Sequence, residues 1–375
     1  MILRIESLQE ACKSILTAVD NNELSAITET LELVTKGKFL FINVTNREYF
    51  AQVKIDINEE IDFHATVNAN LFLKLISQVT TDTVELAVHD QHITVKANGT
   101  YKIPLIFDGE KLLELPEIEI KNVTNQFNIK SDILRSILNY NSKELSKGTI
   151  SKPVQKLYYV DEKGAITFTN GACVNNFELE QPVKLLFNNR LVKLFKLFTD
   201  ETIKFTLGYD AINDDIIQTK VRFESSNIVL TSILSCDDTL LSSVPVGAIR
   251  GLAGANFKYS INISKDYMLQ TINRLLLFAN MGNTKTIVKP YSTFEFYNDY
   301  VVIYDINKEN KEVINYNNTI INCEEPYVAI LDLTELKLTL ETCNEPYLNI
   351  NFGDNKAIVI TRGNISNVIP ECSVS

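Results

Sequence analysis

Apolar residues follow helical spacing and then strand-like alternation three times along the chain of 375 residues. Each copy has an apolar helical segment, a polar break and an alternating strand. The copies are NLFLKLISQVTTDTVELAV from Asn70, NRLVKLFKLFTDETIKFTL from Asn189 and, more loosely, TELKLTLETCNEPYLNINF from Thr334. Spacings of about 120 and about 145 residues are too long for a solenoid unit and indicate three similar domains.

One face of this helix is apolar in each copy. The spacing is i, i+3, i+4, i+7, which is typical of an amphipathic helix. The third copy is the most diverged because Thr339 interrupts its apolar face. The apolar positions are Phe72, Leu75, Ile76 and Val79 in the first copy, Leu191, Leu194, Phe195 and Phe198 in the second, and Leu336, Leu340 and Cys343 in the third.

A second helix is predicted earlier in each copy, directly after a short strand. Alternating runs between the two helices, such as residues 39–44 and 49–57, predict further strands. Each copy is therefore expected to be an α+β unit with two helices and two groups of strands. The predicted helices are residues 7–20, 68–80, 131–146, 188–198, 265–280 and 333–343.

The boundaries between the copies are expected near residues 121–125 and within residues 244–256. The second stretch contains the glycine-rich segment 247–254, which lacks the spacing of a phosphate loop or a dinucleotide site. We interpret it as a flexible connection between domains. The predicted domains are residues 1–122, 123–250 and 251–375.

The charge is unevenly distributed. Thirty-six Lys and Arg against 47 Asp and Glu give a net charge of −11 and argue against a polybasic nucleic-acid or membrane binder. The predicted helices are nevertheless net basic, which suits a helical surface facing phosphate but also fits ordinary solvated helices. In the second copy, Arg190, Lys193 and Lys196 have no acid between them. The helical cations are Lys13, Lys74, Arg135, Lys143, Arg190, Lys193, Lys196, Lys265, Arg274 and Lys337.

Candidate catalytic chemistry is sparse. The chain has three histidines, and His89 and His92 lie between two alternating runs, where a hairpin turn is a better interpretation than a metal site. No GxSxG motif and no CxxC pair is present. We therefore predict no catalytic residues, no metal and no cofactor.

The amino terminus and the hydropathy predict a location. MILRIESLQE lacks the apolar run of a signal peptide, and no stretch of 18 apolar residues occurs. We expect a soluble cytoplasmic protein without a membrane partner.

Three stretches give the chain a resemblance to a known family. Residues 67–105, VNANLFLKLISQVTTDTVELAVHDQHITVKANGTYKIPL, are similar to a family segment of a helix, two strands and a closing strand. Residues 169–174, TNGACV, stand where the family has Thr-Asp-Gly-His-Arg-Leu, and residues 367–370, NVIP, where it has Val-Val-Met-Pro. The chain thus resembles the bacterial-type DNA sliding clamp, the beta subunit of DNA polymerase III, over essentially its whole length.

The resemblance implies a head-to-tail homodimeric ring of six domains. Twelve helices would line a hole around double-stranded DNA, and the ring would tether a DNA polymerase without catalysing a reaction. A clamp loader would be a further partner. The Asn-, Ile- and Lys-rich composition indicates an AT-rich genome. The diverged motifs indicate a divergent branch of the family, such as a bacteriophage or a mobile element.

The resemblance also implies two sites. A hydrophobic pocket for partner peptides would use residues of both diverged motifs. Ala172 and Cys173 replace the usual His and Arg there, which leaves the peptide preference open, and residues 371–375 extend past the family's usual end. The pocket residues would be Val160, Thr169, Gly171, Ala172, Cys173, Val174, Ile369 and Pro370, and the dimer interface would pair Ile103 and Leu105 with Leu277 and Phe278.

Two other classes of protein stay open from the residues alone. A duplicated β-rich structural or adhesion protein would also show internal repeats and Asn-rich strands. An enzyme is disfavoured because the nucleophile, metal and phosphate motifs are missing.

Overall fold

The computed structural model describes residues 1–20, 26–139, 152–213, 216–279, 290–305, 308–320 and 324–372. The chain forms two compact units, each built from two stretches of sequence. Unit 1 consists of Met1–Arg135 and Arg190–Cys236, and unit 2 of Ser136–Asn189 and Asp237–Ser375. The division into three domains at residues 122 and 250 stays a prediction, because strands of neighbouring copies pair with each other inside both units.

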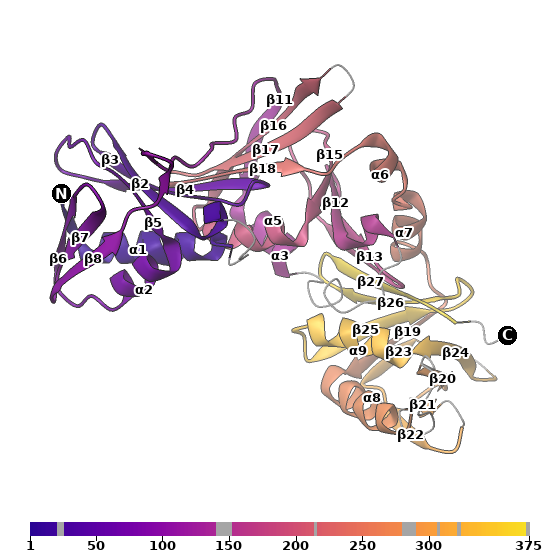
Figure 1. The fold of residues 1–375 in the computed structure, drawn as a ribbon. Coiled ribbons are helices and arrows are strands. Elements are labelled where there is room, and N and C mark those ends of the chain that lie inside the picture. The colour runs from indigo at the N-terminus through magenta and orange to yellow at the C-terminus, as the bar shows by residue number, and fades with distance from the viewer. Residues whose placement is uncertain are drawn as a thin grey trace. The chain divides into compact units, whose positions relative to one another are not determined.

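Unit 1 is built on an eight-stranded sheet of order β11-β16-β17-β18-β4-β3-β2-β5 (Figure 1). The first and second copies each contribute four strands. They meet where β4 pairs antiparallel with β18. The strands are β2 Thr30–Lys36, β3 Phe39–Thr45, β4 Tyr49–Asp56, β5 His64–Asn68, β11 Val123–Lys130, β16 Thr202–Asn213, β17 Ile216–Glu224 and β18 Ile228–Leu234.

A four-stranded sheet of order β1-β6-β7-β8 completes the strands of the first copy. The turn between β6 and β7 contains His89, which confirms the predicted hairpin. The strands are β1 Ile2–Arg4, β6 Thr83–Val88, β7 His92–Lys96 and β8 Thr100–Pro104, and a small hairpin follows at β9 Phe107–Asp108 and β10 Lys111–Leu112.

Unit 2 has a nine-stranded sheet of order β15-β12-β13-β14-β27-β26-β25-β19-β23 and a four-stranded sheet of order β22-β21-β20-β24. The second and third copies meet where β14 pairs antiparallel with β27. The strands are β12 Leu157–Asp161, β13 Gly164–Phe168, β14 Ala172–Asn176, β15 Lys184–Asn188, β19 Tyr259–Ser264, β20 Tyr291–Phe296, β21 Tyr300–Tyr304, β22 Lys311–Asn315, β23 Asn318–Ile320, β24 Tyr327–Asp332, β25 Tyr347–Phe352, β26 Ala357–Arg362 and β27 Ile365–Pro370.

The strand order confirms the threefold repeat. The series β5-β2-β3-β4, β15-β12-β13-β14 and β24-β20-β21-β22 have the same connectivity, as do β1-β6-β7-β8, β11-β16-β17-β18 and β19-β25-β26-β27. Each copy therefore has two four-stranded groups. The strands of one group lie between the two helices in sequence, and the other group combines the strand before the first helix with three strands after the second.

The helices lie where the apolar spacing predicts them. Their inner faces are buried, as at Leu8, Phe72 and Ile272, each 0% exposed. In the second copy, the ring centroids of Phe195 and Phe223 are 5.0 Å apart and join the 3-10 turn after α5 to β17. The helices are α1 Ile5–Ile15 with a 3-10 turn to Ala18, α2 Ala69–Ser77, α3 Ser131–Asn139, α5 Asn189–Leu194 with a 3-10 turn to Leu197, α8 Lys265–Ala279 and α9 Leu333–Thr342. Residues 140–146 of the predicted third helix lie outside the described residues.

The glycine-rich stretch is helical, so its interpretation as a flexible connection was wrong. Asp237 caps α6, Asp238–Ser242, by accepting a hydrogen bond from Leu240 N at 2.7 Å. The next helix, α7, spans Val246–Ala253. Tertiary contacts of α7, described below, override the low helix propensity of its glycines. None of the described helices is long and apolar enough to cross a membrane.

A buried carboxylate ties the segment before β11 to the sheet of unit 1. Asp210, on β16, accepts hydrogen bonds from Lys121 N at 3.0 Å, Asn122 N at 2.9 Å and Lys220 Nζ at 2.9 Å. Burial alone would raise the pKa of Asp210, but these hydrogen bonds outweigh it and lower the pKa to about 2.

Asp210 is expected to make part of the stability depend on pH. Its folded pKa is below its unfolded value of about 3.9, so its contribution is complete above that value and lost as the pH falls towards about 2. Asp210→Asn should lower the free energy of unfolding at pH 7 by about 1–3 kcal/mol. Urea unfolding between pH 7 and pH 3 should show the difference from wild type shrinking at the acid end. The exposed Asp90→Asn is the control, and equal differences at every pH would contradict the assignment.

Candidate functional sites

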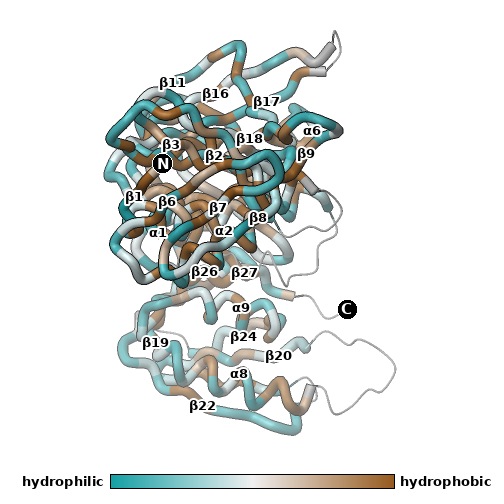
Figure 2. Tube along the Cα trace, turned by 60° about the vertical axis from the view of Figure 1, so that its left-hand side comes forward, coloured by the Kyte–Doolittle hydropathy of each residue, from teal (hydrophilic) through white to brown (hydrophobic). Residues whose placement is uncertain are grey.

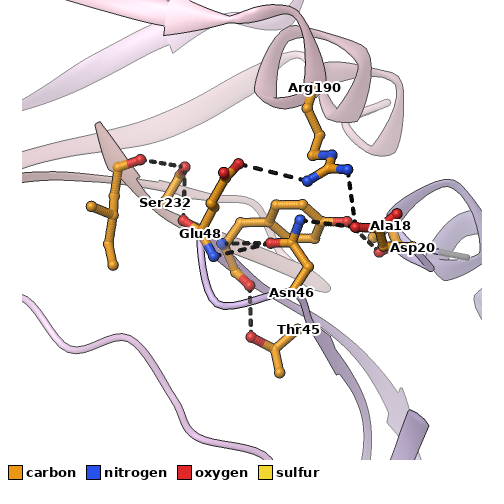
Figure 3. Close-up of polar contacts among 9 residues, drawn as sticks. Ala18, Asp20, Thr45, Asn46, Glu48, Arg190 and Ser232 are labelled. Atoms are coloured by element: carbon orange, nitrogen blue, oxygen red, sulfur yellow. Dashed lines mark hydrogen bonds and ion pairs between the residues drawn. The ribbon is translucent and has the colours of Figure 1, made fainter. Parts of the chain in front are cut away.

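One of the predicted helical cations, Arg190, makes ion pairs inside unit 1. Arg190, at the start of α5, places Nη2 3.0 Å from Asp20 Oδ2 and Nη1 3.7 Å from Glu48 Oε2 (Figure 3). Both acids belong to the first copy, and Glu48 lies in the turn between β3 and β4. Arg190 therefore links the first two copies, although no acid is near it in sequence.

A hydrogen-bond network surrounds this ion pair (Figure 3). Asn46 Oδ1 accepts from the backbone N of Glu48 at 3.1 Å and of Tyr49 at 3.0 Å. The Tyr49 hydroxyl donates to Ala18 O at 2.6 Å, and burial, together with the nearby Asp20 charge, raises the pKa of Tyr49. Ser232 Oγ donates to Glu48 O at 3.2 Å from β18. The network holds the turn before β4 at the junction with β18.

Two cations of the third copy also have partners. Arg274 Nε donates to Glu312 Oε1 at 2.6 Å, and its Nη2 binds the other carboxylate oxygen. The hydrogen bond from Arg274 lowers the pKa of Glu312. Lys265 Nζ donates to Cys343 O at 3.2 Å and lies 3.9 Å from Asp266 Oδ1. These contacts join α8 to β22 and to the end of α9.

The other described cations of the predicted set make no ion pair within the described part of the chain. Figure 1 shows α1, α2 and α5 on one side of the eight-stranded sheet. Four cations on these helices and on the 3-10 turn after α5 share that side of unit 1: Lys13, Lys74, Lys193 and Lys196. Lys13 and Lys74 line a groove of about 360 Å³ between α1 and α2. Lys143 lies outside the described residues. The cations without an ion pair to any described residue are Lys13, Lys74, Arg135, Lys193, Lys196 and Lys337.

Unit 2 contains an apolar groove where β14 meets β27, which we call the α7 groove. Its volume is about 200 Å³, and only Thr169 and Asn170 bring polar side chains to it. A groove of this kind accepts apolar side chains of a ligand. It is lined by Phe168, Thr169, Asn170, Gly171, Ala172, Pro245, Ile249, Leu252, Val368 and Pro370.

The α7 groove includes half of the predicted pocket residues. Thr169, Gly171, Ala172 and Pro370 line it. The other four are at most 2% exposed and are core residues rather than lining: Val160, Cys173, Val174 and Ile369.

The sequence analysis did not predict that α7 forms one wall of the groove. Val246, Ile249 and Ala253 follow helical spacing after Pro245, a signal that the glycines obscured.

The turn at residues 169–171 forms the opposite wall and has little freedom. Thr169 N donates to Gly171 O at 2.8 Å, and Gln155 Nε2 donates to Thr169 O at 2.9 Å. Asn170 Nδ2 donates to Glu335 Oε1, on α9, at 2.7 Å. A Cβ at Gly171 would lie 2.8 Å from Val368 O, so glycine permits the close approach of β27.

The four predicted interface residues differ in exposure. Leu277 and Phe278, at the brown end of α8 in Figure 2, are 64% and 45% exposed. Leu105 is half-buried, and its backbone N donates to Gln91 O at 3.0 Å. Ile103, on β8, is 2% exposed and packs within its own unit.

The histidines do not assemble a metal site among the described residues, where no group of three or more potential ligands occurs. The rings of His89 and His92 stack with centroids 4.9 Å apart. Burial, Lys102 and His89 lower the pKa of His92.

Bacterial beta sliding clamps are similar to this chain in sequence and in structure. No family model matches the chain. The beta sliding clamp of Mycoplasmopsis pulmonis is 27% identical over 204 residues, covering 49% of this chain and 52% of that protein. The chain thus aligns with about half the length of this relative.

Solved structures match over the full length. The DNA polymerase sliding clamp of Bacillus subtilis superimposes with a TM-score of 0.75 at 14% identity, covering 100% of this chain and 99% of that one. The Pseudomonas aeruginosa sliding clamp bound to griselimycin gives 0.78 at 11% identity, with 100% and 99% coverage. The protein therefore has the DNA clamp fold. Its similarity to these bacterial sliding clamps is high in fold but low in sequence.

Substituting an ion-paired helical cation should lower the free energy of unfolding, whereas substituting cations without an ion pair among the described residues should not. Arg190→Gln should lower the free energy of unfolding by about 0.5–1 kcal/mol, because it breaks a half-exposed ion pair with Asp20. Lys193→Gln with Lys196→Gln should leave the free energy of unfolding unchanged. Thermal unfolding at low and high salt measures both, and equal destabilisation by the two variants would contradict the distinction.

Proposed function

We propose that this protein is a DNA sliding clamp: a non-catalytic ring that encircles double-stranded DNA and tethers a replicative DNA polymerase. The observation that carries the proposal is the strand order described above, in a chain whose full length has the clamp fold. The proposal places the protein in the cytoplasm, or in the host cytoplasm if a phage encodes it.

Two sheet edges are open in positions where the other copies are paired. β22 has the same place in its sheet as β4 and β14, and β8 has the same place as β18 and β27. β4 pairs with β18 and β14 with β27, both antiparallel, whereas β22 and β8 end their sheets among the described residues. Pairing β22 of one protomer with β8 of its partner, twice, would close a homodimeric ring of three domains per chain, divided as predicted at 122 and 250.

Exposed apolar side chains accompany these open edges. Val313, on β22, is 57% exposed and Tyr101, on β8, is 39% exposed. Leu277 and Phe278 are on α8, which packs beside β22 through Arg274 and Glu312. Such residues next to an unpaired strand are typical of a subunit interface. In this proposal Leu105 contacts the partner, and Ile103 supports β8 from the inside.

The helical cations would face the DNA in the ring. A closed ring is linked to duplex DNA topologically, so it needs only weak, sequence-independent contacts with phosphates. The six cations that make no ion pair within the described part of the chain supply these contacts. Arg190, Lys265 and Arg274 contribute less because acids neutralise them. The acidic remainder of the chain repels DNA from the outer surface.

The α7 groove would dock linear peptides of the polymerase and of a clamp loader. Its lining contains no charged side chain, so affinity would come from apolar anchors. Ala172 and Cys173 carry no charge, whereas the family that the chain resembles has His and Arg at these two positions. Docking on a ring around DNA would raise the effective concentration of the polymerase at the primer end.

The interface predicts the mass in solution. Light scattering should give about twice the chain mass of 42.5 kDa. Leu277→Asp with Phe278→Asp should reduce it to the mass of a single chain, because two carboxylates would be buried against an apolar surface. Ile217→Asp, at a site that is 69% exposed on β17, is the matched control and should leave the dimer intact. A dimer that survives the double substitution would refute this interface.

Topology tests encirclement of DNA. The ring would be sealed by a disulfide between Leu105→Cys and Leu277→Cys in the presence of nicked circular plasmid, then washed at about 1 M salt, where charges are screened within about 3 Å. The sealed protein should stay on the circle and leave when a restriction enzyme linearises it. Equal retention on circular and linear DNA, or loss from both, would reject the sliding clamp.

A further inference from the structure

The α7 wall of the groove has little stability of its own. Gly247 and Gly251 lie inside α7, and each costs about 1 kcal/mol relative to alanine in a helix. Pro245 at the N-cap makes no side-chain capping hydrogen bond, and Ile249 is the buried residue of the helix, at 7% exposed. Contacts outside the helix must therefore hold it in place.

One ion pair provides such a contact. Arg250 donates from Nη1 to Asp161 Oδ2 at 2.7 Å and from Nη2 to Asp161 Oδ1 at 2.6 Å. This two-pronged geometry is the strongest form of an Arg–carboxylate pair and fixes orientation as well as distance. Asp161 is 4% exposed at the end of β12, where Lys163 N also donates to it at 2.9 Å.

We propose that the Arg250–Asp161 pair is a latch that positions α7 and so sets the width of the groove. Neither residue lines the groove, but Ile249 and Leu252, on either side of Arg250 in sequence, do. Arg250 and Asp161 are therefore positioning residues for the partner peptide, an assignment that rests on the proposed docking function.

The wall opposite α7, formed by the turn at residues 169–171, is too firmly held to change the width of the groove. The turn at residues 169–171 is held by Gln155 and Glu335, and Gly171 lies directly against Val368. A change in groove width must then come from α7.

Substitution of the glycines of α7 changes the stability of this helix independently of the Arg250–Asp161 pair. A Cβ added at Gly247 or Gly251 would meet no heavy atom within 4 Å beyond its chain neighbours and the backbone of its own helix, so alanine fits at both positions. The double substitution Gly247→Ala with Gly251→Ala should stabilise α7 without touching the latch or the groove lining.

The experiment combines hydrogen exchange with peptide binding. Variants Arg250→Gln, Asp161→Asn, the alanine pair and Arg250→Gln with the alanine pair would be compared with the wild type. Hydrogen exchange of residues 249–254 reports how readily the backbone hydrogen bonds of α7 open. Fluorescence polarisation of a labelled peptide Gly-Ser-Leu-Phe-Ser-Gly, which offers two adjacent apolar anchors and no charge, reports binding.

Loss of the latch should speed exchange in α7 and weaken binding of this peptide about tenfold. The alanine pair should slow exchange in the wild type and restore most of the affinity in Arg250→Gln. Arg222→Gln removes an arginine that pairs with Glu224 in unit 1 and should change neither measurement.

The latch is refuted if Arg250→Gln leaves exchange in α7 unchanged, or if exchange rises equally throughout the chain. It is also refuted if the alanine pair slows exchange without restoring affinity. If Arg250→Gln does not fold, Asp161→Asn decides, because it weakens the same ion pair and must speed exchange in α7 and weaken peptide binding. If the wild type binds no peptide while the latch variants still loosen α7, the docking function fails and the latch stands.

Discussion

Antiparallel pairing between edge strands of successive copies is the interaction on which the rest of the structure depends. A strand at the edge of a sheet leaves a row of backbone N–H and C=O groups without partners. In this chain β4 and β18 satisfy each other, and so do β14 and β27. These pairings turn separate four-stranded groups into long sheets and assign the helices to one side of the unit 1 sheet.

The two junctions share a backbone pattern but carry different side chains. At the first, Arg190, Asp20 and Glu48 make an ion-paired network. At the second, Gly171 lies against Val368, and the short side chains nearby leave an apolar groove that α7 closes. The first junction therefore contributes to internal stability, whereas the second leaves an apolar groove at the surface of unit 2, which is the docking site in the proposed function.

Much of the fold was predictable because it is encoded locally. The helix faces of Phe72 and Leu191 are apolar at helical spacing, and the hairpin at His89 has its own turn residues. The partners of the cations were not predictable, since Arg190 and Asp20 lie far apart in sequence and meet only through the strand pairing. For the same reason the resemblance placed Gly171 in the pocket but did not reveal that α7 completes the groove. There the local signal of the glycines opposed the tertiary contact of Arg250, and the tertiary contact prevailed.

The open edges have a consequence for assembly geometry. In the proposed ring, β22 and β8 are different surfaces, so their contact is head-to-tail, and nothing within it limits the number of chains to two. Closure depends on the angle that each contact imposes. A substitution beneath α8 that rotated β22 by a few degrees would leave the contact area nearly unchanged but convert closed rings into open helical filaments. The stiffness of the sheets, more than the strength of the contact between β22 and β8, would then decide whether the protein forms closed rings or filaments.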